Sequence, residues 1–159
     1  MGRAAGKGES EQPIVLPRHA IMALMRAADG ARRAMTRTLH AFDLTLPQFN
    51  VLTILRFHDE LPTFQVAARM VENTPGITRL MSTLEEKGYI RRSQSAGDRR
   101  QQLCALTTTG KRVVDAAMPR IAATQQRLLE DLSRAEALQI TTLLRRVPPP
   151  DGANRAPER

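Results

Sequence analysis

The sequence predicts a mainly α-helical domain that carries one short, arginine-rich β-hairpin. Three observations favour this fold class. Long segments near both ends repeat apolar residues at helical spacing, two short helical segments lie only a few residues apart, and a pair of segments with strand character follows them. The length of 159 residues suits a single domain. We therefore expect a helix-turn-helix and a hairpin between two long helical segments.

The two ends of the chain differ in composition from the middle. Gly, charged and polar residues dominate the start, and Pro, Gly and charged residues dominate the end. We expect a flexible N-terminal tail at 1–17, a folded domain at 18–147 and a disordered C-terminal tail at 148–159. The sequence shows neither an apolar signal-peptide segment nor an apolar run of membrane-spanning length, so a cytoplasmic protein is expected.

The chain is strongly basic, with 24 Lys and Arg against 16 Asp and Glu and a net charge of +8. This excess favours a polyanionic partner such as nucleic acid. A solvated helical surface rich in arginine would have the same composition, so charge alone does not decide between the two. Aromatic residues make up only 3% of the sequence, which argues against single-strand binding by base stacking.

Two helices are predicted before residue 60. Apolar residues recur at helical spacing over 18–42 and predict a long amphipathic helix. The sequence TLPQ then predicts a capping box between Thr45 and Gln48, with Pro47 in the first turn. The helix that follows is apolar on nearly all sides, so we expect it in the centre of the fold.

A helix-turn-helix is predicted at 63–88. After a turn at 61–62, Thr63 is expected to cap a short helix over 64–71. Thr74 is expected to cap a second helix that begins at Pro75.

This second helix is expected to end at Lys87, and Gly88 then takes the left-handed position that favours glycine. A glycine at position 76 costs stability in such a helix, and two explanations for its presence are open. Either the missing side chain lets the helix end approach DNA closely, or the glycine is simply tolerated in a frayed first turn.

The segment 89–106 predicts a basic wing. Strands are expected at 89–94 and 99–106, with SAGD as the turn between them. A helix-turn-helix followed by such a hairpin is a winged helix-turn-helix. Helical spacing returns over 109–147, where Pro119 is expected to kink the first helix and SRAE, from Ser133, to open the last.

The exposed face of the second short helix is the candidate DNA-reading surface. Its apolar residues cluster on one side, and a recognition helix meets base edges with its N-terminal part. Arg79 can make a bidentate contact with guanine, while Thr78 and Ser82 suit phosphates or thymine methyls. The alternative is an ordinary solvated helix face. The candidate residues are Thr74, Pro75, Gly76, Thr78, Arg79 and Ser82.

The wing supplies a second group of candidate residues: Arg91, Arg92, Asp98, Arg99 and Arg100. An arginine at the tip can enter a minor groove, and the sequence does not decide between Arg99 and Arg100. Asp98 would repel phosphate, so its expected role is to hold a nearby arginine in place. A solvated basic hairpin on a protein of another function is the alternative.

These residues resemble the multiple antibiotic resistance regulator (MarR) family of bacterial transcription factors. The resemblance covers roughly 20–147 and is most specific in LTLPQFNVL (44–52), TPGITRLMSTLEEKGYIRR (74–92) and DRRQQLCALTTTG (98–110). It implies a homodimer, built from intertwined helices at 18–42 and 109–147, that binds a pseudo-palindromic duplex site and usually represses transcription. A constitutive architectural or protein-interaction module is the alternative. No constellation of catalytic groups is present in the sequence, so no enzyme is expected.

Many members of this family bind a small aromatic or phenolic effector between the dimerisation helices and the winged part. The matching region here offers Met22, Met25, His40 and Phe49, although the pattern of each favours a core residue over a pocket residue. The histidines lack metal-ligand spacing, so neither a metal nor another cofactor is expected. Cys104 is the single cysteine, which excludes an intramolecular disulfide, and we expect it to be a small apolar filler of the returning strand.

Overall fold

The computed structural model describes residues 16–70, 76–94, 97 and 101–147. Outside these ranges lie most of both predicted tails and the candidate residues Thr74, Pro75, Asp98, Arg99 and Arg100. The elements in chain order are α1 (Leu16–His40), α2 (Leu46–Arg56), β1 (Leu61–Pro62), α3 (Thr63–Arg69), α4 (Ile77–Glu86), β2 (Ile90–Gln94), β3 (Gln102–Leu106), α5 (Thr108–Leu128) and α6 (Arg134–Leu144).

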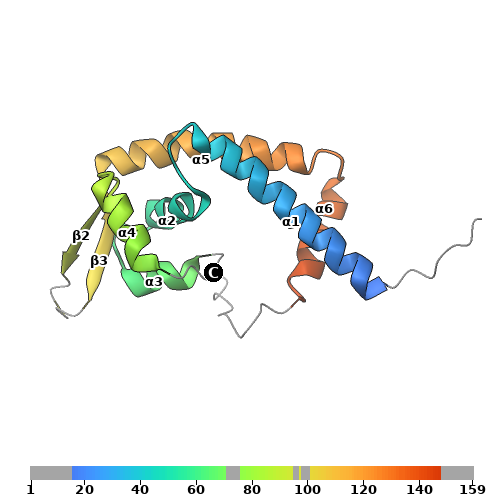
Figure 1. Cartoon of the computed structure of the whole chain (residues 1–159), viewed down its shortest axis with the longest axis horizontal. Helices are drawn as coiled ribbons and strands as arrows, with labels where there is room; N and C mark the ends of the chain where they lie inside the picture. The colour runs from blue at the N-terminus through green and yellow to red at the C-terminus, as the bar shows by residue number, and fades with distance from the viewer. Residues whose placement is uncertain (1–15, 71–75, 95–96, 98–100, 148–159) are drawn as a thin grey trace, which may run out of the picture.

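The helices and the sheet divide the molecule into a winged part and a helical part. The winged part consists of α3, α4 and the three strands. The helices α1 and α5 lie side by side above α2, and the first turn of α5 reaches the wing (Figure 1). After α5, the chain turns back into α6 at the far end from the wing (Figure 1). None of the described helices is long and apolar enough to cross a membrane.

The sheet has three antiparallel strands in the order β1-β3-β2. The hairpin of β2 and β3 was predicted, but the turn predicted at 61–62 is wrong, because Leu61 pairs with Cys104 and Pro62 with Leu103. A two-residue strand lacks the alternating pattern by which strands are recognised, and proline is found mainly on edge strands such as this one.

Both predicted capping boxes are confirmed. The Thr45 hydroxyl accepts a hydrogen bond from the Gln48 backbone N–H at 3.3 Å, and the Gln48 side chain accepts one from the Thr45 N–H at 3.0 Å. Ser133 and Glu136 form the same arrangement at the start of α6. The cap predicted at Thr63 is wrong: this residue begins α3 itself, and its hydroxyl donates to the Gln102 carbonyl at 3.2 Å instead.

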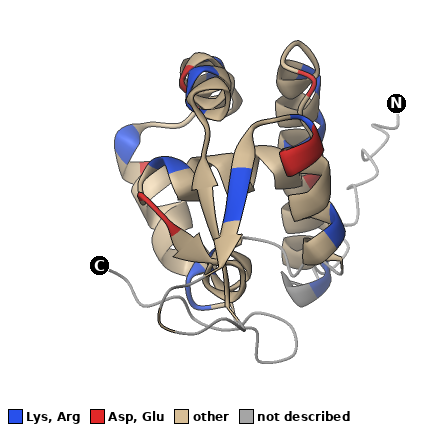
Figure 2. Ribbon diagram, turned by 90° about the vertical axis from the view of Figure 1, so that its left-hand side faces the viewer, with Lys and Arg blue, Asp and Glu red and all other residues tan. Residues whose placement is uncertain are grey.

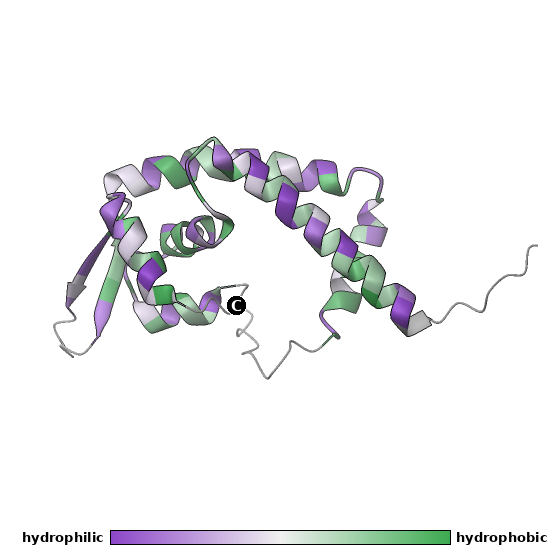
Figure 3. Cartoon of the chain, viewed as in Figure 1, coloured by the Kyte–Doolittle hydropathy of each residue, from purple (hydrophilic) through white to green (hydrophobic). Residues whose placement is uncertain are grey.

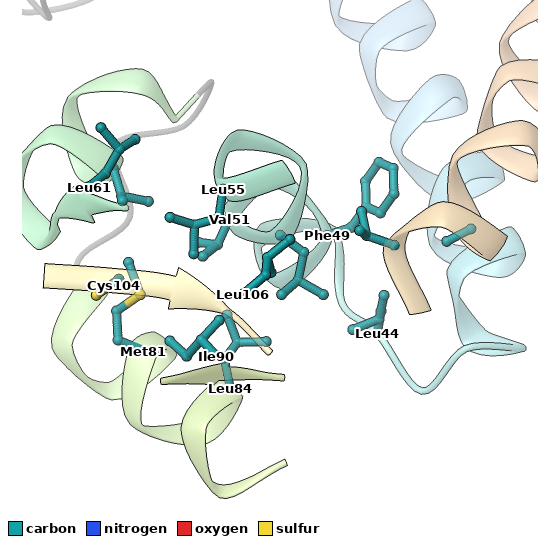
Figure 4. Packing of buried hydrophobic residues seen from close by; sticks show 14 of the residues in the cluster. Leu44, Phe49, Val51, Leu55, Leu61, Met81, Leu84, Ile90, Cys104 and Leu106 are labelled. Atoms are coloured by element: carbon teal, nitrogen blue, oxygen red, sulfur yellow. The ribbon is translucent and has the colours of Figure 1, made fainter. Parts of the chain in front are cut away.

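The hydrophobic core lies where α2 meets the sheet, α4 and α5 (Figure 4). As predicted, α2 is central: Val51, Leu52 and Leu55 are almost fully buried. Pro119 lies inside α5, which continues on both sides of it. The core residues on the neighbouring elements include Leu39, Leu61, Met81, Leu84, Ile90, Leu106, Val114, Ala117 and Ile121.

The last helix differs from the rest because none of its residues is buried. Its apolar residues are exposed, with Ile140 at 41% and Leu144 at 43%. Apolar positions also continue along the part of α1 that extends away from the winged part (Figure 3). Among the residues that the structure describes, nothing covers these two apolar helix surfaces.

Candidate nucleic-acid interface

The two faces of α4 are those that the sequence predicted. Met81 and Leu84 are fully buried, and Ile77 and Leu80 pack against the core cluster. On the opposite face, Thr78 and Arg79 are exposed and Ser82 is half-buried. The Arg79 side chain forms no hydrogen bond or ion pair with the described residues, so its guanidinium is available to a ligand.

The start of α4 differs from the prediction. The helix begins at Ile77 and not at Pro75, and the residue before it, Gly76, has a left-handed conformation with φ of +92°. This conformation, outside the helix, explains the glycine, because a side chain at this φ strains the backbone. Gly76 therefore does not destabilise a helix interior, and its presence needs no compensation through close approach to DNA. Leu80 N–H donates to the Gly76 carbonyl at 3.0 Å and closes the first turn.

An ion pair ties the wing to α4. Nε of Arg92 donates to a carboxylate oxygen of Glu85 at 2.7 Å, and a second guanidinium nitrogen contacts the same oxygen. Arg92 lies opposite the buried Cys104 in the sheet, so its side chain leaves the inner face of β2, toward α4. The hydrogen bond from Arg92 lowers the pKa of the Glu85 carboxyl, so the pair is charged at neutral pH.

Arg91, which precedes Arg92 in β2, points to the other face of the sheet, because successive residues of a strand alternate. One guanidinium nitrogen of Arg91 lies 3.8 Å from a carboxylate oxygen of Glu60, and the Ser93 hydroxyl donates to that oxygen at 3.0 Å. Carboxylates outside the hairpin therefore hold β2 from both faces. Basic positions occur on β2 and on the helices around the sheet (Figure 2).

The end of α4 is tied to the loop between α1 and α2. Nζ of Lys87 donates to the Asp43 carboxylate at 2.8 Å and to the Asp43 backbone carbonyl at 2.6 Å. Among the described residues other than glycine, Asp43 has a positive φ, at +50°. The hydrogen bond from Lys87 lowers the pKa of the Asp43 carboxyl. Sequence reasoning missed this tie, since the two residues lie far apart in the chain and neither belongs to a motif.

The base of the wing is packed closely against the start of α5. Thr107 caps α5, and its hydroxyl also donates to the Gly88 carbonyl at 2.6 Å. A Cβ atom at Gly110 would lie 2.0 Å from the Tyr89 carbonyl oxygen, so only glycine fits there. The TTTG sequence at 107–110, which opens α5, was a signal for this contact, although spacing alone does not reveal what the glycine touches.

The four predicted effector residues are not brought together within one chain. Phe49 belongs to the core at 7% exposure, whereas Met22 and Met25 are exposed on α1. His40 lines a concavity of about 830 Å³ beside Asp43 and Lys87. Cys104 is fully buried, as expected of a filler, and burial raises the pKa of its thiol.

Comparison with known proteins agrees with this geometry. The MarR family model matches residues 44–101. An uncharacterised HTH-type transcriptional regulator of Bacillus cereus is 30% identical over 117 residues, which are 74% of this chain and 78% of that protein.

Solved structures share the fold. A MarR mutant from E. coli, solved with operator DNA, matches with a TM-score of 0.74 and 23% identity over 85% of this chain and 96% of that one. CouR from Rhodococcus jostii RHA1, solved with p-coumaroyl-CoA, matches with a TM-score of 0.72 and 26% identity over 83% of this chain and 93% of that one.

Together with the fold, these similarities identify a winged helix-turn-helix protein that binds DNA and regulates transcription. The chain belongs to the MarR family, which is a family of transcriptional regulators and not of enzymes.

Proposed function

We propose that this regulator binds a pseudo-palindromic duplex site as a homodimer and represses transcription by occupying it. The observation that carries the proposal is the exposed N-terminal half of α4, where Arg79 has no partner among the described residues. Thr78 and Ser82 share this face of the helix. In a major groove, Arg79 pairs with guanine while the two hydroxyl groups contact phosphate or a thymine methyl.

The wing contributes in two ways. The residues at its tip, Arg99 and Arg100, are proposed to contact the minor groove, as their position after the turn suggests, and Asp98 to hold one of them in place. For Arg92 we propose a role other than the predicted DNA contact. Because its guanidinium is already paired with Glu85, we assign it to positioning the wing relative to α4. Arg91, whose side chain is 62% exposed, remains available to phosphate.

Dimerisation is proposed from the uncovered apolar surfaces. The exposed residues on α1 and α6 are Ile21, Met22, Met25, Leu138, Ile140, Leu143 and Leu144. A second copy of the chain would cover both helices and remove these residues from water. This role also accounts for Met22 and Met25 without a ligand. In a homodimer the two recognition helices would face adjacent major grooves.

A small aromatic or phenolic effector is proposed to modulate DNA affinity. CouR, a relative of similar fold, was solved with p-coumaroyl-CoA. In this chain, the tie between Lys87 and Asp43 joins the end of α4 to the loop after α1, so a ligand against α1 could act on the recognition helix. His40, beside that tie, is the predicted effector residue that remains next to a concavity.

Selection of bound sites from random duplexes tests the proposal. We expect an inverted repeat whose half-site centres are about 10–10.5 base pairs apart, bound at least about 10³-fold more tightly than random DNA. Equal affinity for all sequences would instead favour an architectural module. A reporter with the selected site across its promoter then tests repression, and rising transcription on addition of the protein would contradict it.

Arg79→Ala tests the major-groove assignment. We expect a loss of about 1–3 kcal/mol of discrimination at one base pair of each half-site. Arg26→Ala is the matched control, since Arg26 is an exposed α1 residue without a partner in the described ranges. If both variants weaken binding equally for every sequence, Arg79 contacts only phosphate.

Ile140→Asp tests the dimer. A charge on the uncovered face of α6 should convert the dimer to monomers in sedimentation experiments and weaken specific DNA binding. Phe57→Asp is the control, because Phe57 is 68% exposed at the end of α2, away from the proposed interface. Unchanged association of Ile140→Asp would exclude α6 from the interface.

A further inference from the structure

The hydroxyl group of Ser82 on α4 is not bonded to its own helix. A serine or threonine inside a helix can donate its hydroxyl hydrogen to the backbone carbonyl four residues earlier. Thr83, the next residue, does so to the Arg79 carbonyl at 3.0 Å. In the described part of the chain Ser82 has no such bond to the Thr78 carbonyl, and its hydroxyl contacts the Arg92 guanidinium at 3.4 Å instead.

The direction of the bond between Ser82 and Arg92 follows from the chemistry of the two groups. A guanidinium has N–H donors and no acceptor, so Arg92 donates and the Ser82 oxygen accepts. The hydroxyl hydrogen of Ser82 is therefore not used in this contact. No acceptor for that hydrogen lies among the residues that the structure describes. It is available to a ligand.

Glu85 holds the guanidinium that contacts Ser82. Nε of Arg92 donates to a Glu85 carboxylate oxygen at 2.7 Å, and the nitrogen that reaches Ser82 contacts the same oxygen. The Arg92 side chain is 21% exposed, so it is largely shielded from water. The ion pair therefore presents an N–H to Ser82 from a fixed position on β2.

Ser82 lies on the face of α4 that is turned away from the core. Thr78, one turn earlier on this face, is exposed, whereas Met81 and Leu84 on the opposite face are fully buried. One side of the Ser82 hydroxyl is occupied by Arg92, and the bond to the helix backbone is not made. Its hydrogen is left for a group that lies over the outward face of the helix.

We propose that Ser82 donates a hydrogen bond to an acceptor on DNA and that Arg92 is the positioning residue for its hydroxyl group. The acceptor is a phosphate oxygen or an acceptor atom on a base edge in the major groove. Without Arg92, the hydrogen would turn to the Thr78 carbonyl, as the Thr83 hydrogen turns to the Arg79 carbonyl. This inference rests on the proposed function, because it specifies what one residue of the DNA-reading face contributes.

Titration of the full chain with the duplex that it selects tests the Ser82 hydroxyl. We expect Ser82→Ala to weaken binding about three- to tenfold, as for the loss of one hydrogen bond, and Ser82→Thr to restore most of the affinity. Thr83→Ala is the matched control: its hydroxyl hydrogen is already used within α4, so binding should change less than about twofold. Equal losses in Ser82→Ala and Thr83→Ala, or no loss in Ser82→Ala, would overturn the proposal.

Two sets of altered duplexes identify the acceptor. One set replaces single phosphates by methylphosphonates, and the other replaces single base pairs of a half-site. We expect one position at which wild type loses affinity and Ser82→Ala does not, because the variant has no bond to lose there. Its presence in the first set identifies a phosphate, and in the second a base. Parallel losses of the two proteins at every position of both sets would show that Ser82 meets no acceptor on DNA.

The positioning role of Arg92 is tested by measuring the Ser82→Ala effect in two backgrounds. In Arg92→Met, which has no donor, Ser82→Ala should cost less than about twofold; in Arg92→Lys, which keeps a cationic donor, the larger cost should return. A displaced wing cancels in each comparison, because both proteins compared carry the same residue at position 92. An unchanged Ser82 effect in Arg92→Met, or equal effects in the two backgrounds, would overturn the positioning role.

The selection experiment separates this proposal from the proposed function. If no preferred duplex site is found, the proposed function fails and the Ser82 contact fails with it. If a preferred site is found and Ser82→Ala binds it as tightly as wild type does, the regulator binds DNA as proposed and only the Ser82 hydrogen bond is refuted.

Discussion

Among the described glycines, Gly110 is the one whose surroundings leave no room for an added methyl group. In Gly110→Ala the new Cβ atom would lie 2.0 Å from the Tyr89 carbonyl oxygen and 2.8 Å from its carbon. Optimal contact between non-bonded heavy atoms needs about 3.5 Å, so the backbones of α5 and the wing must separate by about 1.5 Å. Backbone atoms form the obstacle, and no change of side-chain rotamer relieves it.

The expected cost follows from what this separation disturbs. Overpacking a core costs about 1–3 kcal/mol where side chains can yield, and we expect at least about 3 kcal/mol where they cannot. The separation also strains the hydrogen bond from Thr107 N–H to the Tyr89 carbonyl, 3.0 Å long. Gly30→Ala is the matched control: nothing lies within 4 Å of its new Cβ, and it removes a glycine from a helix. It should stabilise the protein by about 0.5–1 kcal/mol.

Urea and thermal unfolding at one protein concentration measure both variants. For a domain of this size, about 3 kcal/mol corresponds to a melting temperature lower by roughly 10 °C for Gly110→Ala, with a small increase for Gly30→Ala. A free energy of unfolding for Gly110→Ala within about 0.5 kcal/mol of wild type would refute the reasoning. The close contact between α5 and the base of β2 would then not exist in solution.

Three further predictions concern the winged part. Arg92→Gln and Glu85→Gln should each weaken DNA binding at pH 7. The double variant should bind no more weakly than either single variant, because both remove the same ion pair. Additive losses in binding titrations would show that the two residues act independently. Since the pKa of Glu85 is lowered, the stability from this pair should persist at neutral pH and decline only as pH falls below the ordinary value of 4.5, which acid unfolding of wild type and Glu85→Gln can measure. The Cys104 thiol, buried and with a raised pKa, should react with a thiol reagent at least about 100-fold more slowly in the native protein than in urea; equal rates would show that the returning strand opens readily.

The sequence predicted features that depend on residues close together in the chain. The capping boxes at Thr45 and Ser133 require only a hydroxyl and a side chain three residues later, and both are present in the structure. The left-handed Gly88, with φ of +68°, follows from its position after a helix. The inward and outward faces of α4 follow from helical periodicity, which is independent of what covers each face.

Features that depend on distant residues were not predictable. β1 exists only because β3 pairs with it, and the position of Arg92 on the inner face of β2 depends on the register against Cys104. The basic pattern of the hairpin suggested a DNA contact for Arg92. That pattern does not indicate the ion-pair partner Glu85, which belongs to α4. The conformation of Gly76 is set by how the chain enters α4, which no local pattern specifies.

The short strand β1 has a consequence for how copies of this protein can associate. An open sheet edge is a template onto which another chain can add a strand. On the outer edge of β1, Pro62 has no N–H to offer, and the strand ends after two residues. The opposite edge, β2, carries the charged side chains Arg91 and Arg92, which a strand added there would have to accommodate. Both edges of the sheet therefore disfavour the addition of a strand from another copy.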